Sequence, residues 1–202
     1  MLFRSSPTLS EYDRVKTQVL TPAGVTEKQV QAIWLKQADM GPTNALPLAN
    51  ANAYSLEQEL GNILRAVKVR YPNVRQVFLS SRIYAGFATT QLNPEPYAYE
   101  SGFSVKWVVQ AQIDQMRNGG TPVSSLAGNL NYKTGAAAWI AWGPYMWANG
   151  QTPRADGLFW QPGDFQSDGT HPSTSGAAKV TAMLMNFFLN SPYTPWFRAS
   201  SH

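Results

Sequence analysis

Three short apolar runs, separated by stretches of helical periodicity, constrain the fold of this chain more than any other feature. The runs cover residues 32–35, 77–79 and 136–142, and Gly143 and Pro144 end the last one. Each run is continuous rather than alternating, which is typical of strands buried on both faces of a parallel sheet. Helices between such strands cover the two faces of the sheet. The sequence therefore predicts an α/β fold with a doubly wound parallel sheet.

The spacing of apolar residues predicts helices before, between and after these strands. A first helix is expected over residues 10–20, and Thr26 followed three residues later by Gln29 is typical of a capping box. A second helix should end near residues 71–72, a third should end at residues 118–120, and a fourth should lie near the C-terminus. The apolar positions of these last three helices are Leu56, Leu60, Ile63, Leu64 and Val67, then Val105, Val109 and Ile113, then Val180, Leu184, Phe187 and Phe188.

Composition favours one globular domain over residues 1–202 and argues against several other classes of protein. Hydrophobic residues make up 44% of the chain and charged residues 14%, and no long apolar run predicts a transmembrane helix. The net charge is +4, but the densest basic group, at residues 65–75, is expected to stabilise the end of a helix. We therefore expect neither nucleic acid nor membrane as a partner. Cysteine is absent and the N-terminus lacks the apolar stretch of a signal peptide, so the compartment stays unknown.

One short motif carries residues suited to catalysis: Asp168, Gly169, Thr170, His171 and Pro172. It lies just before the predicted C-terminal helix, and the next residue, Ser173, is a suitable N-cap for that helix. An aspartate three residues before a histidine can hold one ring nitrogen and leave the other free to take a proton from a nucleophile. The other interpretation is an aspartate that caps a turn, with a histidine packed beside it. The second histidine, His202, is the terminal residue.

The segment from Asp168 to Ser173 is similar to the last sequence block of the SGNH (GDSL-like) hydrolases, a family of serine esterases and acetylesterases. The resemblance implies a three-layer α/β/α, flavodoxin-like domain, of which this chain covers roughly the C-terminal two-thirds. It also implies that Asp168 orients His171, that His171 is the general base, and that the substrate is an ester of a small molecule or carbohydrate. Members of the family are often exported. Further stretches that resemble a bacterial branch of the family are residues 80–86, 93–100, 142–145, 156–158 and 164–165.

The family's first block, a Gly-Asp-Ser segment that holds the nucleophile, has no match in this sequence. By the family's order that serine belongs before Met1, and the predicted sheet is correspondingly short of strands. The third block is matched only by residues 36–39, which lack its glycine and asparagine. Ser80 and Ser81 end a predicted strand and are candidate substitute nucleophiles, although hydroxyls there also commonly bond to local backbone.

A polar substrate would need a lining, for which the candidates are Arg82, Tyr84, Glu100 and Tyr145. Their other interpretation is an ordinary ion pair and aromatic packing. The seven tryptophans are expected to pack in the core, with an aromatic platform for carbohydrate as the alternative. One internal histidine and no cysteine predict no metal site, and the absence of a glycine-rich loop predicts no nucleotide cofactor.

Three functional hypotheses follow. The chain is part of a genuine SGNH ester hydrolase of the carboxylesterase or acetylesterase type, or it is an enzyme that uses Ser80 or Ser81. Alternatively it is an inactive remnant that binds a ligand or partner through the former cleft. A sheet that lacks its first strands would also expose an edge, so we expect self-association there.

Overall fold

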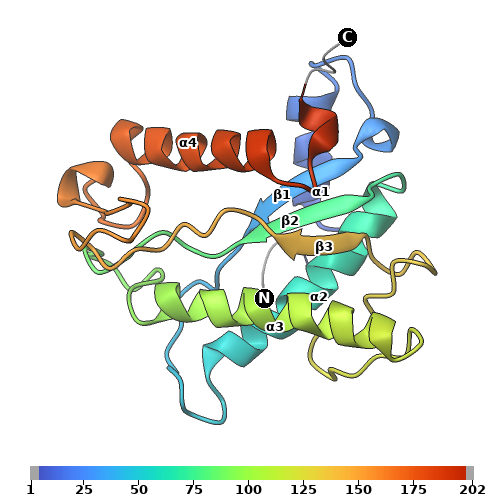
Figure 1. Ribbon diagram of the computed structural model, residues 1–202, viewed down its shortest axis with the longest axis horizontal. Coiled ribbons are helices and arrows are strands. Elements are labelled where there is room, and N and C mark those ends of the chain that lie inside the picture. The colour runs from blue at the N-terminus through green and yellow to red at the C-terminus, as the bar shows by residue number, and fades with distance from the viewer. Residues whose placement is uncertain (1–4, 199–202) are drawn as a thin grey trace.

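The computed structural model describes residues 5–198 and has a mixed α/β fold built on a three-stranded parallel sheet (Figure 1). The strands are β1 (Ala32–Lys36), β2 (Gln76–Ser80) and β3 (Trp139–Trp142), in the order β1-β2-β3. Ala32 lies opposite Gln76, and Gln76 lies opposite Trp139. All three predicted strands and their parallel arrangement are confirmed.

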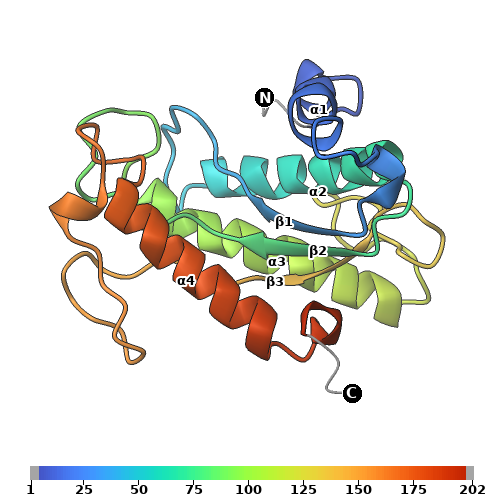
Figure 2. The same cartoon turned by 90° about the horizontal axis from the view of Figure 1, so that it is seen from above.

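Within residues 5–198, four α-helices surround the sheet, each where the sequence predicts one. They are α1 (Ser10–Val15), α2 (Asn52–Arg70), α3 (Tyr97–Arg117) and α4 (Thr174–Asn190). Helix α1 continues into a π-helical turn, η1 (Lys16–Leu20), and short 3-10 turns occur at η2 (Glu27–Gln29), η3 (Pro162–Asp164) and η4 (Pro195–Phe197). The two views agree that α2 and α3 lie together on one side of the sheet and α4 on the other (Figures 1 and 2).

The larger part of the core lies between the sheet and the helices α2 and α3. Side chains of α2 and of the central strand are closed to solvent there: Ile63 and Leu64 in α2 and Val77 and Leu79 in β2 are all 0% exposed. Residues at i, i+3 and i+4 of a helix point to the same side, which is why the apolar stripe of α2 packs as one surface on the strand.

The outer edge of β3 is closed by a side chain rather than by another strand. Gln112 of α3 donates to the backbone oxygen of Ala138 at 2.9 Å and accepts from the backbone N–H of Ile140 at 2.8 Å. Gln112 is only 2% exposed, so its amide replaces a missing ladder partner inside the core. Strand β1 is different: within residues 5–198 its only strand partner is β2.

Strand β1 is less buried than its continuous apolar sequence predicts. Leu35 is its only fully buried residue, whereas the last four residues of β2 are all buried. The expectation of strands buried on both faces is therefore correct for β2 and wrong for β1. The physical reason is position, because β1 lies at an edge of the sheet and β2 lies between two neighbours.

The second face of the sheet is covered more thinly, by α4. Phe78 of β2 is 0% exposed and meets Phe187 and Phe188 of α4 edge-on, with ring centroids 5.1 and 5.9 Å apart. Gly176 is the only fully buried residue of α4, and Met185 and Leu189 are 44% and 43% exposed. One aromatic cluster centred on Phe78 thus attaches this helix to the sheet.

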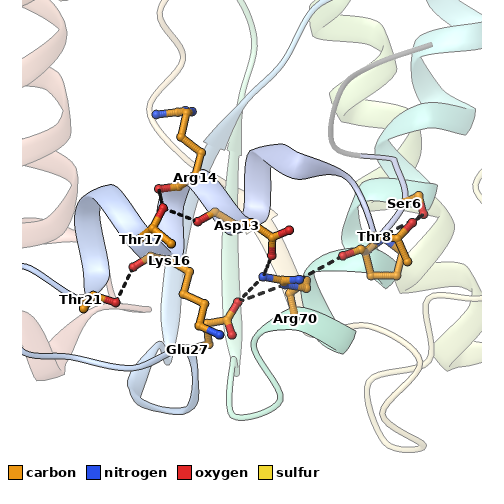
Figure 3. Close-up of polar contacts among 10 residues, drawn as sticks. Ser6, Thr8, Asp13, Arg14, Lys16, Thr17, Thr21, Glu27 and Arg70 are labelled. Carbon is orange, nitrogen blue, oxygen red and sulfur yellow. Dashed lines mark hydrogen bonds and ion pairs between the residues drawn. The ribbon is translucent and has the colours of Figure 1, made fainter.

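The N-terminal segment is tied to the end of α2 by Arg70 (Figure 3). Its guanidinium donates to Glu27 at 2.7 and 3.0 Å and to Asp13 at 2.8 Å. The side chain of Lys68 donates to two backbone oxygens just beyond the helix, those of residues 72 and 74. Both cations lie in the last turn of α2, where their sequence position predicts them, but their hydrogen bonds go to groups outside the helix. In the described part of the chain, no helix is long and apolar enough to cross a membrane.

We predict that Phe78→Ala destabilises the protein by about 3–5 kcal/mol, because it removes a fully buried ring and the anchor of α4. Urea denaturation followed by circular dichroism measures the change in the free energy of unfolding. Val69→Ala is the control, since Val69 is 67% exposed and its loss should cost less than about 0.5 kcal/mol. Equal effects of the two substitutions would contradict the anchoring role.

Candidate functional site

The motif from Asp168 to Pro172 forms a tight loop that leads into α4. Phe165 and Pro172 form an antiparallel bridge, and the N–H of Gln166 donates to the backbone oxygen of His171 at 2.8 Å. The N–H of Thr89 donates to the backbone oxygen of Asp168 at 3.0 Å, which fixes the tip of the loop to a second loop. Hydrogen bonds at both ends therefore hold the motif in one conformation.

Helix α4 begins directly after the motif, with the N-cap that the sequence predicts. The Ser173 hydroxyl accepts from the N–H of Gly176 at 3.4 Å and donates to the backbone oxygen of Gly163 at 2.8 Å. Serine is a preferred N-cap residue because its oxygen satisfies one of the free N–H groups of the first turn. His171 thus lies two residues before the N-cap of α4.

Asp168 and His171 form a hydrogen-bonded pair. Oδ2 of Asp168 lies 2.5 Å from Nδ1 of His171, while Oδ1 accepts from the N–H groups of Thr170 at 2.9 Å and His171 at 3.0 Å. The hydrogen bond from His171, followed by these backbone N–H groups, lowers the pKa of Asp168 from 3.8 to about 2. At neutral pH Asp168 is therefore a carboxylate, and it accepts the proton on Nδ1.

The tautomer that follows leaves Nε2 of neutral His171 as a hydrogen-bond acceptor. The His171 side chain is 56% exposed and the Asp168 side chain is 27% exposed, so the imidazole is the more accessible member of the pair. Both interpretations of the motif hold together here: the aspartate caps the turn through Oδ1 and orients the imidazole through Oδ2. The arrangement can accept a proton from a hydroxyl and return it to a leaving group.

Gly169 allows the loop to turn at this point. Its φ is +63°, and a Cβ atom there would lie 1.9 Å from the backbone oxygen of Phe87. A side chain is therefore excluded both by the left-handed backbone conformation and by the neighbouring loop. The glycine brings the loops around Phe87 and Asp168 together, and so fixes where His171 lies.

Arg82 follows β2 and lies against the loop of the motif. It is 7% exposed, and its Nη2 donates to the backbone oxygen of Thr170 at 3.4 Å. Nε has no hydrogen-bond partner among residues 5–198. Burial lowers the pKa of Arg82, while the nearby charges of Glu95 and Asp168 oppose that effect. Of the candidate lining residues, Arg82 is the one that the structure brings to the Asp168–His171 pair.

Lys36, at the end of β1, places a second cation in this region. Burial, followed by repulsion from Arg82, lowers its pKa from 10.5 to about 8. Lys36 lies opposite Ser80 in the sheet, at the carboxyl ends of the strands, where open α/β sheets bind their ligands. The sequence assigns Lys36 no role, because the weak match of residues 36–39 to the family's third block gives no function to a lysine, and one lysine after an apolar run is an ordinary strand end.

The other candidate lining residues occupy three separate places. Tyr84 packs edge-on against Phe87 and Trp147, at centroid distances of 5.1 and 6.2 Å. Glu100 is 6% exposed and accepts from the backbone N–H of residue 46 at 3.0 Å, and burial raises its pKa. Tyr145 is 41% exposed and lines a different hollow. These three residues therefore do not form one pocket with Arg82.

Ser80 and Ser81 are both 1% exposed. The Ser80 hydroxyl accepts from Nε1 of Trp34 at 3.0 Å and donates to the backbone oxygen of Pro144 at 2.7 Å, so its proton is already engaged. The Ser81 hydroxyl has no hydrogen-bond partner within the described residues. Ser80 bonds to backbone in the way that the non-catalytic interpretation of these serines expects.

Comparison with known proteins returned no relatives: no family model, no curated protein and no solved structure matches this chain. The described residues also hold no group of three or more histidines and carboxylates placed to bind a metal ion. His202 lies outside the described residues. The pair formed by Asp168 and His171 is thus the feature on which a functional proposal must stand.

We predict opposite effects of removing the two serine hydroxyls. Ser80→Ala should lower the free energy of unfolding by about 1–3 kcal/mol, because the indole N–H of Trp34 and the carbonyl of Pro144 lose their partner. Ser81→Ala should leave it unchanged or raise it, because a buried hydroxyl without a partner is removed. Urea denaturation of both variants tests this, and a loss confined to Ser81→Ala would contradict the assignment.

The carboxylate of Asp168 should stabilise the fold in a pH-dependent way. Its pKa is lowered in the folded protein, so the contribution is complete above pH 4 and is lost as the pH falls from about 4 to about 2. The stability difference between the wild type and Asp168→Asn, measured by urea denaturation, should therefore shrink across that interval. A difference that stays constant from neutral pH down to about pH 2 would show that the ionised carboxylate is not responsible.

Proposed function

We propose that this chain is part of a serine ester hydrolase of the SGNH type, in which His171 is the general base and Asp168 orients it. The observation that carries the proposal is the geometry of the pair: a carboxylate at 2.5 Å from Nδ1, held by two backbone N–H groups, with an exposed imidazole.

The proposed fold is a flavodoxin-like α/β/α domain that lacks its first strands. Helices α2 and α3 on one side of the sheet and α4 on the other are compatible with three layers (Figure 1). The outer edge of β1, which has no strand partner within the described residues, is compatible with a further parallel strand, since the edge of β3 is already closed by Gln112. A serine at the carboxyl end of a strand beside β1 would lie at the same end of the sheet as Arg82 and His171.

In the proposed reaction Nε2 of His171 takes the proton of the serine hydroxyl as its oxygen attacks the ester carbonyl. The imidazolium that forms is stabilised by Asp168, whose carboxylate keeps the ring in the right tautomer. The histidine then returns the proton to the departing alcohol, and water repeats the sequence on the acyl enzyme. Asp168 is suited to this role because its pKa is too low for it to take the proton itself.

Two observations argue against a nucleophile within the described residues. Ser80 and Ser81 are buried, and the Ser80 proton is donated to a carbonyl oxygen. Between residues 5 and 198, no serine or threonine hydroxyl is hydrogen-bonded to Nε2 of His171. The same observations favour the second candidate function, an inactive remnant that binds a ligand or partner through the former cleft.

Fluorophosphonate labelling of the full natural product, with the adduct located by peptide mass spectrometry, separates these functions. We expect one adduct, on a serine that precedes β1, and its loss in His171→Ala but not in the matched control His202→Ala. Asp168→Asn should slow labelling by about 10²–10⁴-fold, because the ring loses its tautomer and its counter-charge.

The other outcomes are equally informative. An adduct on Ser80 or Ser81 that disappears in His171→Ala would keep the ester hydrolase and overturn the proposed place of the nucleophile. A folded protein that gives no adduct and hydrolyses no ester would reject the hydrolase in favour of the binding protein. Labelling and ester hydrolysis that His171→Ala leaves unchanged would reject His171 as the general base.

A further inference from the structure

A second hollow is lined by residues of α3, of the end of β3 and of the segment that follows β3, and neither Asp168 nor His171 belongs to the lining. Its volume is about 320 Å³, near the lower end of the range of small-molecule sites. We call it the aromatic hollow. Its lining residues are Tyr99, Gly102, Phe103, Lys106, Trp142, Gly143 and Tyr145.

The walls of the aromatic hollow are rings that hold one another in place. Tyr99 meets Phe103 edge-on at 5.5 Å and Trp147 at 4.7 Å, and Trp142 meets Tyr145 edge-on at 6.2 Å. Tyr99 and Tyr145 nevertheless remain 41% exposed, so part of each ring is open to a ligand. Fixed, partly exposed ring faces favour a flat apolar ligand, which they contact by stacking or edge-on.

Gly102 keeps the floor of the hollow open. It lies inside α3, where glycine is the least favourable residue after proline, and its backbone is helical. A Cβ atom there would meet nothing closer than 3.8 Å, the distance to Cβ of Ser81 and to Cε2 of Tyr145. An alanine would therefore fit the helix and the fold, and its methyl group would occupy space between Ser81 and Tyr145.

The electrostatics of the hollow favour an anion. Lys106 is exposed at its rim, and no aspartate or glutamate belongs to the lining. Within the described part of the chain, no carboxylate forms an ion pair with Lys106. Arg154 adds a positive charge over the ring of Tyr145 at 5.4 Å. That charge is partly offset by the ion pair of Arg154 with Asp156 and by Glu95, which accepts from the backbone N–H of Tyr99.

From the rings, the open floor and the lysine we propose that the aromatic hollow binds a planar aromatic carboxylate. The ring lies among Phe103, Trp142 and Tyr145, and the carboxylate is held by Nζ of Lys106. A sugar fits less well, because its hydroxyls need several acceptors and the lining offers no carboxylate or amide side chain. The site is independent of the proposed hydrolase, since it uses neither Asp168 nor His171.

Calorimetric titration of the full chain with naphthoate tests the proposal. We expect saturable binding, weakened more than about tenfold by Gly102→Ala, whose methyl group takes up space at the floor that the ligand would fill. Lys106→Gln should weaken it about two- to fivefold, the range of an exposed charge pair. Naphthylmethanol, which is neutral, should bind the wild type less tightly than naphthoate does. Its affinity for Lys106→Gln should equal its affinity for the wild type.

Matched controls separate ligand binding from folding. Gly163→Ala adds a methyl group where nothing lies within 4 Å, and Lys133→Gln removes an exposed charge outside the hollow; both should bind naphthoate like the wild type. Gly102→Ala should itself raise the melting temperature, by about 2–4 °C, because alanine replaces glycine in a helix.

Three results would overturn the proposal. The first is a folded wild type that does not bind naphthoate, and the second is naphthoate binding that neither Gly102→Ala nor Lys106→Gln changes. The third is a wild type that binds methyl glucoside or naphthylmethanol more tightly than naphthoate. A Gly102→Ala variant with a lowered melting temperature would show that the glycine has a structural role, and Lys106→Gln would then decide the matter alone.

Discussion

The buried carboxylate of Asp164 holds together the part of the molecule on which the candidate site depends. It is 0% exposed and accepts from Nζ of Lys179 at 2.5 Å, from Oγ of Ser175 at 2.9 Å and from the N–H of Gln161 at 3.0 Å. Burial alone would raise the pKa of Asp164, but Lys179 and the other donors hold it below its usual value. A buried carboxylate with this many donors is stable only in one arrangement of its neighbours.

That arrangement positions the Asp168–His171 pair from outside. Lys179 and Ser175 belong to α4, and the backbone oxygen of Asp164 accepts from the N–H of the residue that caps the same helix. The loop of the motif is thus closed between a fixed helix start and the fixed turn η3. A histidine on a mobile loop would lose conformational entropy each time it bound a substrate. Because this loop is fixed in the folded protein, most of that entropy is already lost on folding.

Sequence patterns predict this fold well where one physical effect dominates. Continuous apolar runs predict the positions of all three strands, although burial is nearly complete only at β2 and the edge strand β1 is mostly half-buried. The Asp168–His171 contact follows from a separation of three residues in a tight turn. The role of Gln112 could not be predicted, because it depends on how closely a helix and a strand that are far apart in the chain approach each other. Trp142 belongs to an apolar run, and it lines the aromatic hollow only because neighbouring segments leave it partly uncovered. The lowered pKa of Lys36 likewise arises from burial that no local pattern contains.

The two edges of the sheet explain why the molecule packs unevenly. At the edge of β3, the Gln112 side chain bonds to the backbone oxygen of Ala138 and to the backbone N–H of Ile140. Gln112 is itself buried, so this edge is not open to solvent there. Beside β1 a cavity of about 400 Å³ remains between the strand and α1, lined by Val15, Leu20 and Ile33 among others. Protein interiors are close-packed, so a further element beside β1 would fill this cavity and add contacts to the edge strand. The cavity thus lies beside the edge where the proposed fold requires its next strand.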